Sequence, residues 1–552
     1  MTQALPASAP LVLIEKLDIA LPAGGDRPLA VCGATVSIGR GEVLCIVGES
    51  GSGKSVLAST LAGLLPDALR VTKGRLLFSG QDVLSLNEAQ LRRLRGAKIG
   101  YIFQEPMTAL NPLLTVGRQI AEALEAHGHS APPEKIAELL RAMQLPEPET
   151  ISRRYPHELS GGQRQRVAIA IAMACNPELL IADEPTTALD VTTQAEILKL
   201  ILDLRASRGL TVLFITHDFG VVREIADRVV VMRNGEIVEA ADAGRLLDAP
   251  HHPYTRRLLA AVPALDAAKR PPSSERPVLL KLDGIRKTHA ARRRIFGAPG
   301  RSVTALNGVD LVLREGETLA LVGESGSGKS TLGQVIAGLI ERDDGQFRLS
   351  GEEIRRAGDL FTRERRPAVQ MVFQDPQSSL NPRHSIRRIL TEPVLQSGLG
   401  KAEAEARMVG LLGRIGLDAS AADRKPHAFS GGQRQRIGLA RALMPQPKLL
   451  IADEPVSALD VSVQAQVLDL LAELQRDLGL AMLFITHDLR VAAKVADRIA
   501  VMQRGEIIEE AATADLLHRP QSAYARALLA AIPGRGHEAG DTRLKRLQRD
   551  TA

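Results

Sequence analysis

The sequence predicts an α/β protein built from two copies of one domain, and three observations lead to this prediction. Short apolar runs alternate with amphipathic segments, as in parallel sheets whose strands are joined by helices. Several motifs occur twice in the same order, which indicates a duplicated domain. In each copy a glycine-rich segment ending in Lys-Ser follows an apolar run and precedes a helical pattern, which is the arrangement of a phosphate-binding loop.

The composition fits a chain of several globular domains. At 552 residues, with 45% apolar and 24% charged residues, the chain is too long for one hydrophobic core. Its apolar runs stay shorter than the ~18 residues of a membrane-spanning helix. Met1–Pro6 lacks the basic start of a signal peptide. We therefore expect a cytosolic protein.

Charge and cysteine content narrow the classes of partner. The net charge of +6 comes from 70 basic and 64 acidic residues spread along the chain, which favours a mixed, solvated surface over a basic patch. Composition alone leaves nucleic acid or an anionic membrane open as a partner. The three cysteines, Cys32, Cys45 and Cys175, include no C-x-x-C pair, which argues against a disulfide framework or a zinc site.

The motifs of the first half return in the second half. The offset is 275 residues from Lys54 to Lys329 and 270 residues from Gln104, Glu184 or His217 to its counterpart. A period of this length indicates a duplicated domain rather than a solenoid. We place the first domain at 1–265, a polar, Pro-rich linker at 266–278, the second domain at 279–534 and a disordered tail at 535–552.

Short, uniformly apolar runs predict strands that are buried on both faces of a parallel sheet. In the first copy these runs lie at 43–47, 99–103, 179–182 and 211–215, and helical patterns lie at 56–62, 164–175 and 193–204. The segment 106–159 and its counterpart 376–429 are mostly helical in pattern. We expect each of them to form a helical insertion between nucleotide-binding elements.

The glycine-rich segment Gly48–Ser55, repeated without change as Gly323–Ser330, is the most specific signal. Its glycines let backbone N–H groups approach phosphate oxygens without a Cβ in the way, and the following helix N-terminus adds partial positive charge. The lysine would reach the β- and γ-phosphates, and the last serine would offer its hydroxyl to Mg²⁺. The predicted nucleotide-binding residues are Gly48, Ser50, Gly51, Gly53, Lys54 and Ser55, with Gly323, Ser325, Gly326, Gly328, Lys329 and Ser330 in the second copy.

Two acidic residues follow an apolar strand in each copy. Asp183 and Asp453 end the strand, where a carboxylate can hold Mg²⁺ against the phosphates. Glu184 and Glu454 come next, and the two-residue period of a strand predicts that they point away from the aspartates. A glutamate near the γ-phosphate can polarise the attacking water. The competing interpretation, a solvated turn, is disfavoured by the phosphate-binding loop upstream.

Histidine and glutamine each end a further strand. A lone histidine there is usually a packing or capping residue, and a glutamine an ordinary polar strand end. Because both recur at matched offsets, we predict that His217 and His487 contact the γ-phosphate and that Gln104 and Gln374 sense Mg²⁺ and the water. The predicted metal ligands are Ser55, Gln104 and Asp183, with Ser330, Gln374 and Asp453 in the second copy.

A Ser-Gly-Gly-Gln motif precedes a helical pattern in each copy. Its serine can be only an N-cap. Alternatively, the helix N-terminus forms a second anion site, which makes sense if it serves the nucleotide of the other domain. The residues are Ser160, Gly161, Gly162 and Gln163, with Ser430, Gly431, Gly432 and Gln433 in the second copy.

Together the motifs G-E-S-G-S-G-K-S, F-Q-[ED]-P, S-G-G-Q-R-Q-R, L-I-A-D-E-P, A-L-D and I-T-H-D, each present twice, resemble the ATP-binding cassette (ABC) superfamily over nearly the whole chain. The resemblance implies, in each cassette, a RecA-like core, an antiparallel β subdomain and a helical subdomain, and hydrolysis of ATP at both sites. It also implies head-to-tail pairing, in which Lys54 shares ATP with Ser430–Gln433 and Lys329 shares it with Ser160–Gln163. The aspartates of Ala-Leu-Asp, Asp190 and Asp460, match the loop that bridges the two sites.

Two further segments resemble the dipeptide/oligopeptide/nickel importer branch. One is Glu105–Pro112, repeated as Asp375–Pro382. The other, His252–Leu259, is similar to the C-terminal His-Pro-Tyr extension of that branch, whereas Pro520–Arg526 in the second copy keeps only the tyrosine spacing. Fused double cassettes of this kind resemble ATPase subunits of bacterial peptide importers, including those for microcin C and glutathione.

This resemblance implies an ATPase, using ATP and Mg²⁺, that energises uptake of peptides or peptide-like solutes from the cytoplasmic face of the inner membrane. Its expected partners are two transmembrane permease subunits and, through them, a solute-binding protein, without nucleic acid. Some relatives carry an iron–sulfur cluster after the first extension. No cysteine follows Cys175, so we expect no such cluster.

The adenine contact departs from the family pattern. Relatives stack the base on an aromatic residue before the phosphate-binding loop, but the first aromatic residue here is Phe78, which follows that loop. In the second copy His289 stands roughly where the aromatic residue would be, with Phe296 nearby. We therefore expect the first site to bind nucleotide more weakly and with less selectivity for the base.

Other classes of double-cassette protein remain as alternatives. A soluble translation factor would carry a long, charged helical linker, and a DNA-repair ATPase would carry a coiled-coil or zinc insertion. The sequence shows neither, and the His-Pro-Tyr extension argues against an exporter. The principal alternative is a soluble double-cassette ATPase that acts on ribosomes or nucleic acid.

Overall fold

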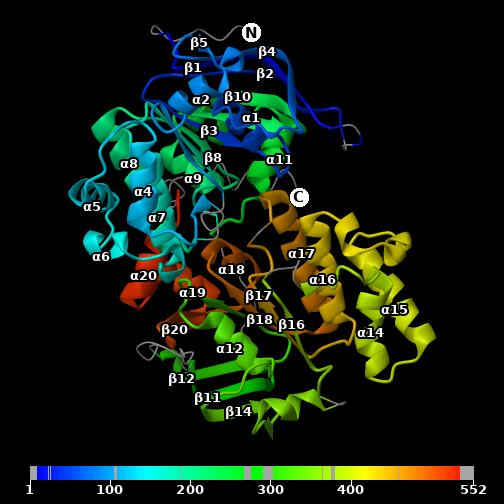
Figure 1. Ribbon diagram of the computed structural model, residues 1–552. Coiled ribbons are helices and arrows are strands. Elements are labelled where there is room, and N and C mark those ends of the chain that lie inside the picture. The colour runs from blue at the N-terminus through cyan, green and yellow to red at the C-terminus, as the bar shows by residue number, and fades with distance from the viewer. Residues whose placement is uncertain are drawn as a thin grey trace. The chain divides into compact units, whose positions relative to one another are not determined.

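The computed structural model describes residues 9–22, 24, 27–104, 109–187, 189–265, 275–289, 302–362, 365–374, 379–457 and 459–534. They form two compact units (Figure 1), and the main division along the chain lies between Val262 and Pro263, although Asp190–Thr192 group with the second unit and Ile532–Gly534 with the first. Both units contain the same succession of sheets and helices, which confirms the predicted duplication. Most of the predicted linker 266–278 and all of the predicted tail 535–552 lie outside the described residues, so the domain limits stay predictions.

A six-stranded sheet in the order β10-β9-β3-β8-β7-β6 forms the centre of the first unit. Five strands are parallel and β10 pairs antiparallel at the edge. The strands are β3 (Val43–Val47), β6 (Ile99–Ile102), β7 (Leu179–Asp183), β8 (Thr211–Ile215), β9 (Arg228–Arg233) and β10 (Glu236–Asp242). The first four agree with the predicted strands to within one residue at each end.

The uniformly apolar strands are buried because both faces of the sheet are covered. Along β3, Val43, Cys45 and Val47 enter one hydrophobic cluster, while Leu44 and Ile46 enter another on the opposite face. The first cluster is completed by helices, which are α4 (Val116–Glu125), α5 (Pro133–Ala142), α6 (Pro148–Ser152), α7 (Gly161–Ala172), α8 (Val191–Arg208), α9 (Phe219–Ile225), α10 (Ala243–Asp248) and α11 (Pro253–Ala261). The helical character predicted for 106–159 is confirmed by α4 to α6.

The second cluster is completed by α1 (Lys54–Leu61), α2 (Glu88–Leu94) and an antiparallel sheet in the order β2-β1-β4-β5. Its strands are β1 (Val12–Ala20), β2 (Leu29–Ile38), β4 (Arg70–Phe78) and β5 (Gln81–Asp82). β1 bulges at Lys16, whose φ is 47°, opposite Gly74 of β4. The bulged backbone comes so close that a Cβ on Gly74 would lie 2.6 Å from the Leu17 Cα.

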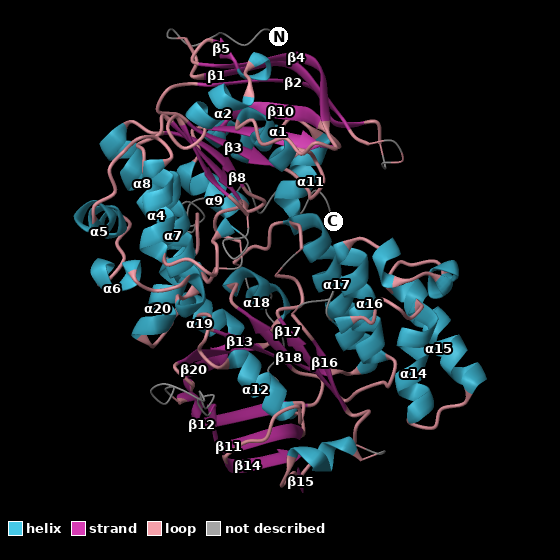
Figure 2. Ribbon diagram, viewed as in Figure 1, coloured by secondary structure: helices cyan, strands magenta, loops and turns pink. Residues whose placement is uncertain are grey.

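The second unit repeats this architecture (Figure 2), with a six-stranded sheet ordered β16-β17-β18-β13-β19-β20 and an antiparallel sheet ordered β12-β11-β14-β15. Its strands are β11 (Val278–His289), β12 (Val303–Arg314), β13 (Thr318–Val322), β14 (Asp344–Leu349), β15 (Glu352–Glu353), β16 (Val369–Val372), β17 (Leu449–Asp453), β18 (Ala481–Thr486), β19 (Arg498–Gln503) and β20 (Glu506–Ala512). Its helices are α12 (Lys329–Ile336), α14 (Ile386–Gln396), α15 (Lys401–Arg414), α16 (Gly431–Leu443), α17 (Val461–Leu478), α18 (Leu489–Val495), α19 (Thr513–His518) and α20 (Ala523–Ala530). Within the described part of the chain, each helix is too short or too polar to span a bilayer.

Replacing Gly74 by alanine should destabilise the first unit by about 2 kcal/mol or more, because φ is +99° there and the added Cβ would clash with β1. Gly80 is the matched control, since its φ of +81° carries a similar strain but nothing lies within 4 Å of its Cβ position. Gly80→Ala should therefore cost only about 1 kcal/mol. Urea unfolding followed by proteolysis of the first unit measures both, and equal losses would contradict the close approach of β1.

Candidate active sites

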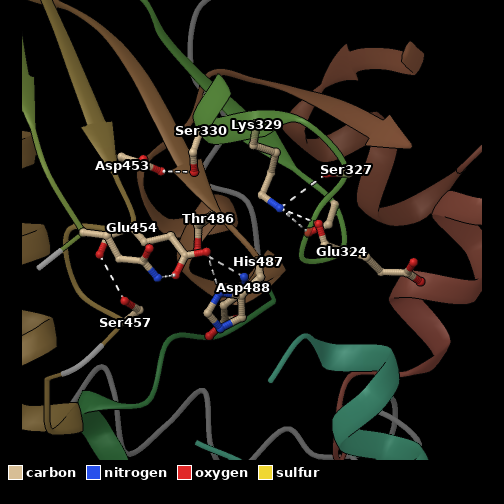
Figure 3. Close-up of polar contacts among 12 residues, drawn as sticks. Glu324, Ser327, Lys329, Ser330, Asp453, Glu454, Ser457, Thr486, His487 and Asp488 are labelled. Carbon is tan, nitrogen blue, oxygen red and sulfur yellow. Dashed lines mark hydrogen bonds and ion pairs between the residues drawn. The ribbon is translucent and has the colours of Figure 1, made fainter. Parts of the chain in front are cut away.

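In both units the phosphate-binding loop closes around the ammonium group of its own lysine. Lys54 Nζ donates to the carbonyl oxygens of Gly48 and Glu49 at 2.8 and 2.9 Å. Lys329 Nζ donates to those of Gly323 and Glu324 at 2.8 and 2.7 Å (Figure 3). Each lysine is only 5% exposed, so these carbonyl groups compensate a buried cation.

Glycine is required where neighbouring backbone approaches the loop. A Cβ on Gly48 would lie 2.2 Å from the Met232 carbonyl oxygen, and one on Gly53 would lie 2.5 Å from the Ala30 carbonyl oxygen. The second loop meets the equivalent backbone atoms at Gly323 and Gly328. The exposed residues at the tips of the two loops are Ser50, Gly51, Ser325 and Gly326.

The loop serine contacts the strand-ending aspartate in each unit. Ser55 Oγ donates to Asp183 Oδ1 at 3.0 Å, and Ser330 Oγ donates to Asp453 Oδ1 at 3.1 Å. Hard oxygen donors of this kind fit Mg²⁺, which is commonly held by one or two carboxylates together with substrate phosphates and water. No cluster of three or more His, Cys, Asp or Glu side chains suited to a metal occurs among the described residues.

Glutamine, glutamate and histidine converge in each site. Glu184 Oε2 accepts from Gln104 Nε2 at 3.0 Å and lies 3.5 Å from His217 Nδ1. In the second unit Glu454 Oε2 accepts from Gln374 Nε2 at 2.9 Å, and Glu454 Oε1 lies 3.2 Å from His487 Nδ1. The structure thus brings together the three residue types that the sequence singled out as catalytic.

The predicted reason for the direction of the glutamates is wrong. Strand alternation does not extend to them, because β7 and β17 end at the aspartates and the next residue turns into the left-handed region, with φ of 48° at Glu184 and 45° at Glu454. A non-glycine residue with such a φ is strained, and this strain is characteristic of functional sites. The backbone N–H groups of Glu184 and Glu454 donate to the carbonyl oxygens of Ile215 and Ile485, which hold the turn against the neighbouring strand.

In each site the surroundings shift the pKa of the aspartate and the pKa of the glutamate in opposite directions. Burial raises the pKa of Asp453 to about 6, in spite of the hydrogen bond from Ser330, and it raises the pKa of Asp183 as well. Burial acts in the same direction on Glu184, but the hydrogen bond and charge of His217 outweigh it and lower the pKa to about 2. The pKa of Glu454 is lowered likewise by His487, so both glutamates are ionised near neutral pH.

The two sites differ in residues that the sequence analysis did not identify. In the first site Tyr101 Oη donates to Asp183 Oδ2 at 3.1 Å and Thr187 Oγ1 donates to Glu184 Oε2 at 3.0 Å. Met371 and Ser457 occupy the corresponding positions of the second site, where Ser457 Oγ donates to the backbone oxygen of Glu454 at 3.2 Å. An alignment of the two halves would have revealed the Tyr-to-Met difference, but not its contact with the aspartate.

The Ser-Gly-Gly-Gln motif starts a helix in each unit, as its first interpretation predicted. Ser160 Oγ accepts from Gln163 N at 3.3 Å, and Gln163 Oε1 accepts from Ser160 N at 3.1 Å. Ser430 and Gln433 form the same reciprocal cap on α16 at 3.3 and 3.0 Å. The second glycine has a packing role, because a Cβ there would lie 2.5 Å from Thr193 Cγ2 at Gly162 and 2.5 Å from Val463 Cγ1 at Gly432. Gly161 and Gly431 lie between the capping serine and the glycine that packs against the neighbouring helix. The predicted anion site at this motif stays a prediction.

Other residues named in the sequence analysis lie outside these clusters or outside the described residues. His289 is the exposed last residue of β11 and pairs with Val303, while Phe296 lies outside the described residues, so the adenine contact stays a prediction. Asp460 occupies the N-cap position of α17 without a side-chain cap hydrogen bond, and Asp190 accepts from Thr192 Oγ1 at 2.7 Å. Cys45 is buried in β3.

Comparisons with known proteins agree with this geometry. The ABC transporter family profile matches residues 31–187 and 306–457. A second profile, the C-terminal region of oligopeptide/dipeptide transporters, matches 238–294 and 508–551. The second match extends the sequence-based interpretation, because the second extension is recognised as well although it keeps only the tyrosine spacing.

Curated relatives align over nearly the whole chain. The glutathione import ATP-binding protein GsiA of Escherichia coli O157:H7 is 46% identical over 95% of this chain and 89% of its own length. The protein of the same name from Pectobacterium atrosepticum is 45% identical over the same shares. Among solved structures, the cassette MJ0796 in a dimeric post-hydrolysis state with ADP and Pi is 29% identical over 43% of this chain and 99% of its own, with a TM-score of 0.38.

Profile matches over more than half of the chain and relatives of this identity establish the family. In both cassettes the loop lysine bonds loop carbonyl groups, the loop serine contacts the aspartate, and the glutamate lies beside the glutamine and the histidine. The chain therefore belongs to the ABC transporter family and is an ATP-binding, ATP-hydrolysing protein of the oligopeptide/dipeptide importer type.

Proposed function

We propose that this protein energises the uptake of peptides or peptide-like solutes, with glutathione as the first candidate, through two separate permease subunits fed by a solute-binding protein. The observation that carries the proposal is an ABC transporter family match in each cassette followed by an importer-type C-terminal extension. The names of the relatives supply the candidate solute. The protein would act at the cytoplasmic face of the inner membrane, bound to its permeases.

In each site the glutamate is the proposed base. Glu184 and Glu454 are ionised and are oriented by a glutamine and a histidine, so each can accept a hydrogen bond from the attacking water and align it with the γ-phosphate. His217 and His487 would then contact the γ-phosphate, and Lys54 and Lys329 would exchange loop carbonyl groups for phosphate oxygens. Mg²⁺, held by the serine and aspartate of each site, would neutralise charge on the β- and γ-phosphates.

The serine motifs are proposed to complete the sites in trans. Ser160–Gln163 would contact the nucleotide held by Lys329, and Ser430–Gln433 would contact the nucleotide held by Lys54. Support comes from the helix dipoles of α7 and α16, which begin at these motifs. The partial positive charge at a helix N-terminus favours a bound anion. ATP binding would thereby draw the cassettes together, and hydrolysis would release them.

The second cassette offers a surface for a permease. A cavity of about 320 Å³ lies between the strand β16 and the helices α14 and α16 and is lined in part by Phe373. Exposed apolar side chains line it, among them Leu339, Phe361 and Phe373. Phe373 directly precedes Gln374, which hydrogen-bonds the catalytic Glu454. A permease segment bound in this cavity would therefore be coupled to changes at Glu454.

Changing both catalytic bases, Glu184→Gln and Glu454→Gln, should abolish turnover while leaving ATP bound. Loss of a general base lowers the rate by about 100- to 10,000-fold, and the amide keeps the size of the carboxylate. Phosphate release and retention of radiolabelled ATP measure the two effects. The conservative change Thr187→Ser is the control in the first site, and undiminished hydrolysis in the double variant would refute the assignment.

Placing a charge in the cavity should separate permease binding from catalysis. Leu339→Asp is expected to reduce recovery of the permease subunits with the tagged chain from native membranes, since burial of an unpaired carboxylate is costly. Val409→Asp is the control, because Val409 on α15 has the same 47% exposure as Leu339 and does not line the cavity. Basal ATP hydrolysis should survive in both. Ribosomes or nucleic acid in place of permeases would favour the alternative function.

The two ATP sites should differ in affinity. The Lys54→Ala chain reports on the second site and the Lys329→Ala chain on the first, and stacking of the base is worth about 1–3 kcal/mol, or roughly 5- to 150-fold. We expect tighter ATP binding in Lys54→Ala, measured by calorimetry, and a loss of this advantage when His289→Ala is added. Equal affinities in the two lysine variants would contradict the predicted adenine contact.

A further inference from the structure

The C-terminal extension of each cassette reaches back to the phosphate-binding loop through one tyrosine. Tyr254 Oη, on α11, accepts from the backbone N–H of Glu49 at 3.3 Å. Tyr524 Oη, on α20, accepts from the backbone N–H of Glu324 at 3.1 Å. Burial raises the pKa of each hydroxyl, and the charge of the same glutamate raises it further. Each extension thus contacts the second residue of the loop through one phenol.

The position of the tyrosine is fixed by a second glutamate in the preceding strand. Glu239 of β10 accepts from the backbone N–H groups of His251 and His252 at 2.7 and 3.1 Å, directly before α11. In the second cassette Glu509 of β20 accepts from those of Gln521 and Ser522 at 2.8 and 2.7 Å. The start of the extension helix is therefore tied to the main sheet in both cassettes.

The same β-hairpin holds the loop from another side. The turn between β9 and β10 donates from Gly235 N to the carbonyl oxygen of Ser52 at 3.0 Å, and Gly505 N donates to Ser327 at 2.8 Å. Each loop is consequently fixed at its second residue by the tyrosine and at its fifth residue by the hairpin. Between these two points lies the exposed tip of each loop, which is Ser50 and Gly51 in the first cassette and Ser325 and Gly326 in the second.

We propose that Tyr254 and Tyr524 are positioning residues that hold the phosphate-binding loops in the shape that accepts ATP. The inference rests on the role of the loops in ATP binding and is independent of the solute. In sequence the two extensions share little around the tyrosine, since His252 and Pro253 are replaced by Ser522 and Ala523. The contact to the loop is nevertheless the same in both.

The tyrosine is more buried in the first cassette than in the second. Tyr254 is 3% exposed, and the guanidinium group of Arg233 lies 4.9 Å from the centre of its ring. Tyr524 is only partly buried, and Gln503 stands at the position that corresponds to Arg233. Burial raises the pKa of both phenols to about 12, so each keeps its proton at physiological pH and can donate to the glutamate carboxylate while accepting from the backbone.

Removing only the hydroxyl tests the proposal. In Tyr254→Phe and Tyr524→Phe the Glu49 or Glu324 amide loses its acceptor, and the fraction of loops in the binding shape falls. We expect KM for ATP to rise about 3- to 30-fold with kcat within about twofold of the parent, and the larger rise in Tyr254→Phe. Each Tyr→Phe substitution should also be introduced into the Glu184→Gln/Glu454→Gln chain. Equilibrium binding of ATP to these triple variants should be weaker than to the double variant by the same factor.

Controls distinguish positioning from general stability. Arg257→Ala and Ala527→Ser change exposed positions on the same two helices and should leave KM unchanged. Glu239→Gln, which keeps one acceptor oxygen, should shift KM in the same direction as Tyr254→Phe and by less. An unchanged KM in both Tyr→Phe variants, or a fall in kcat at constant KM, would overturn the proposal. A parent chain that binds no ATP would instead overturn the proposed function.

Discussion

Each nucleotide site depends on a lysine ammonium group that the protein buries. A buried cation needs compensation, and the loop supplies it by turning the carbonyl groups of its first two residues inward. This arrangement explains why glycine is needed at Gly48 and Gly53, where the backbone passes too close to its neighbours for any side chain. The strand before the loop and the helix after it are placed by the same constraint, so the main sheet of each cassette is organised around this charge.

The catalytic carboxylate is held by a different kind of constraint. Glu184 and Glu454 occupy a left-handed turn at the end of a fully buried strand, and a histidine that follows the adjacent strand keeps each of them ionised. The glutamine that completes the cluster lies two residues after the edge strand and before the helical insertion. The glutamine side chain therefore connects the charge of the glutamate to the helical insertion, where we propose that a permease binds.

Much of this was predictable from sequence because it depends on local patterns. The buried strand β3 is uniformly apolar and leads into the loop that carries Lys-Ser, and the buried strand β7 ends at the Asp-Glu pair, so the parallel order of the strands brings the two pairs to the same edge of the sheet. The conformation of Glu184 was not predictable, because strand periodicity ends one residue before it. The contacts of Tyr101 with Asp183 and of Tyr254 with Glu49 join residues that are 82 and 205 positions apart, and a single sequence carries no signal for such pairs.

The distribution of aromatic residues has a practical consequence. The chain contains no tryptophan and only four tyrosines. Three of them, Tyr101, Tyr254 and Tyr524, hydrogen-bond residues of the nucleotide sites. Because a chain without tryptophan emits chiefly through tyrosine, the ultraviolet emission of the native protein originates mainly from groups that adjoin the nucleotide sites. A change in this emission on addition of nucleotide would report on the sites without an attached dye.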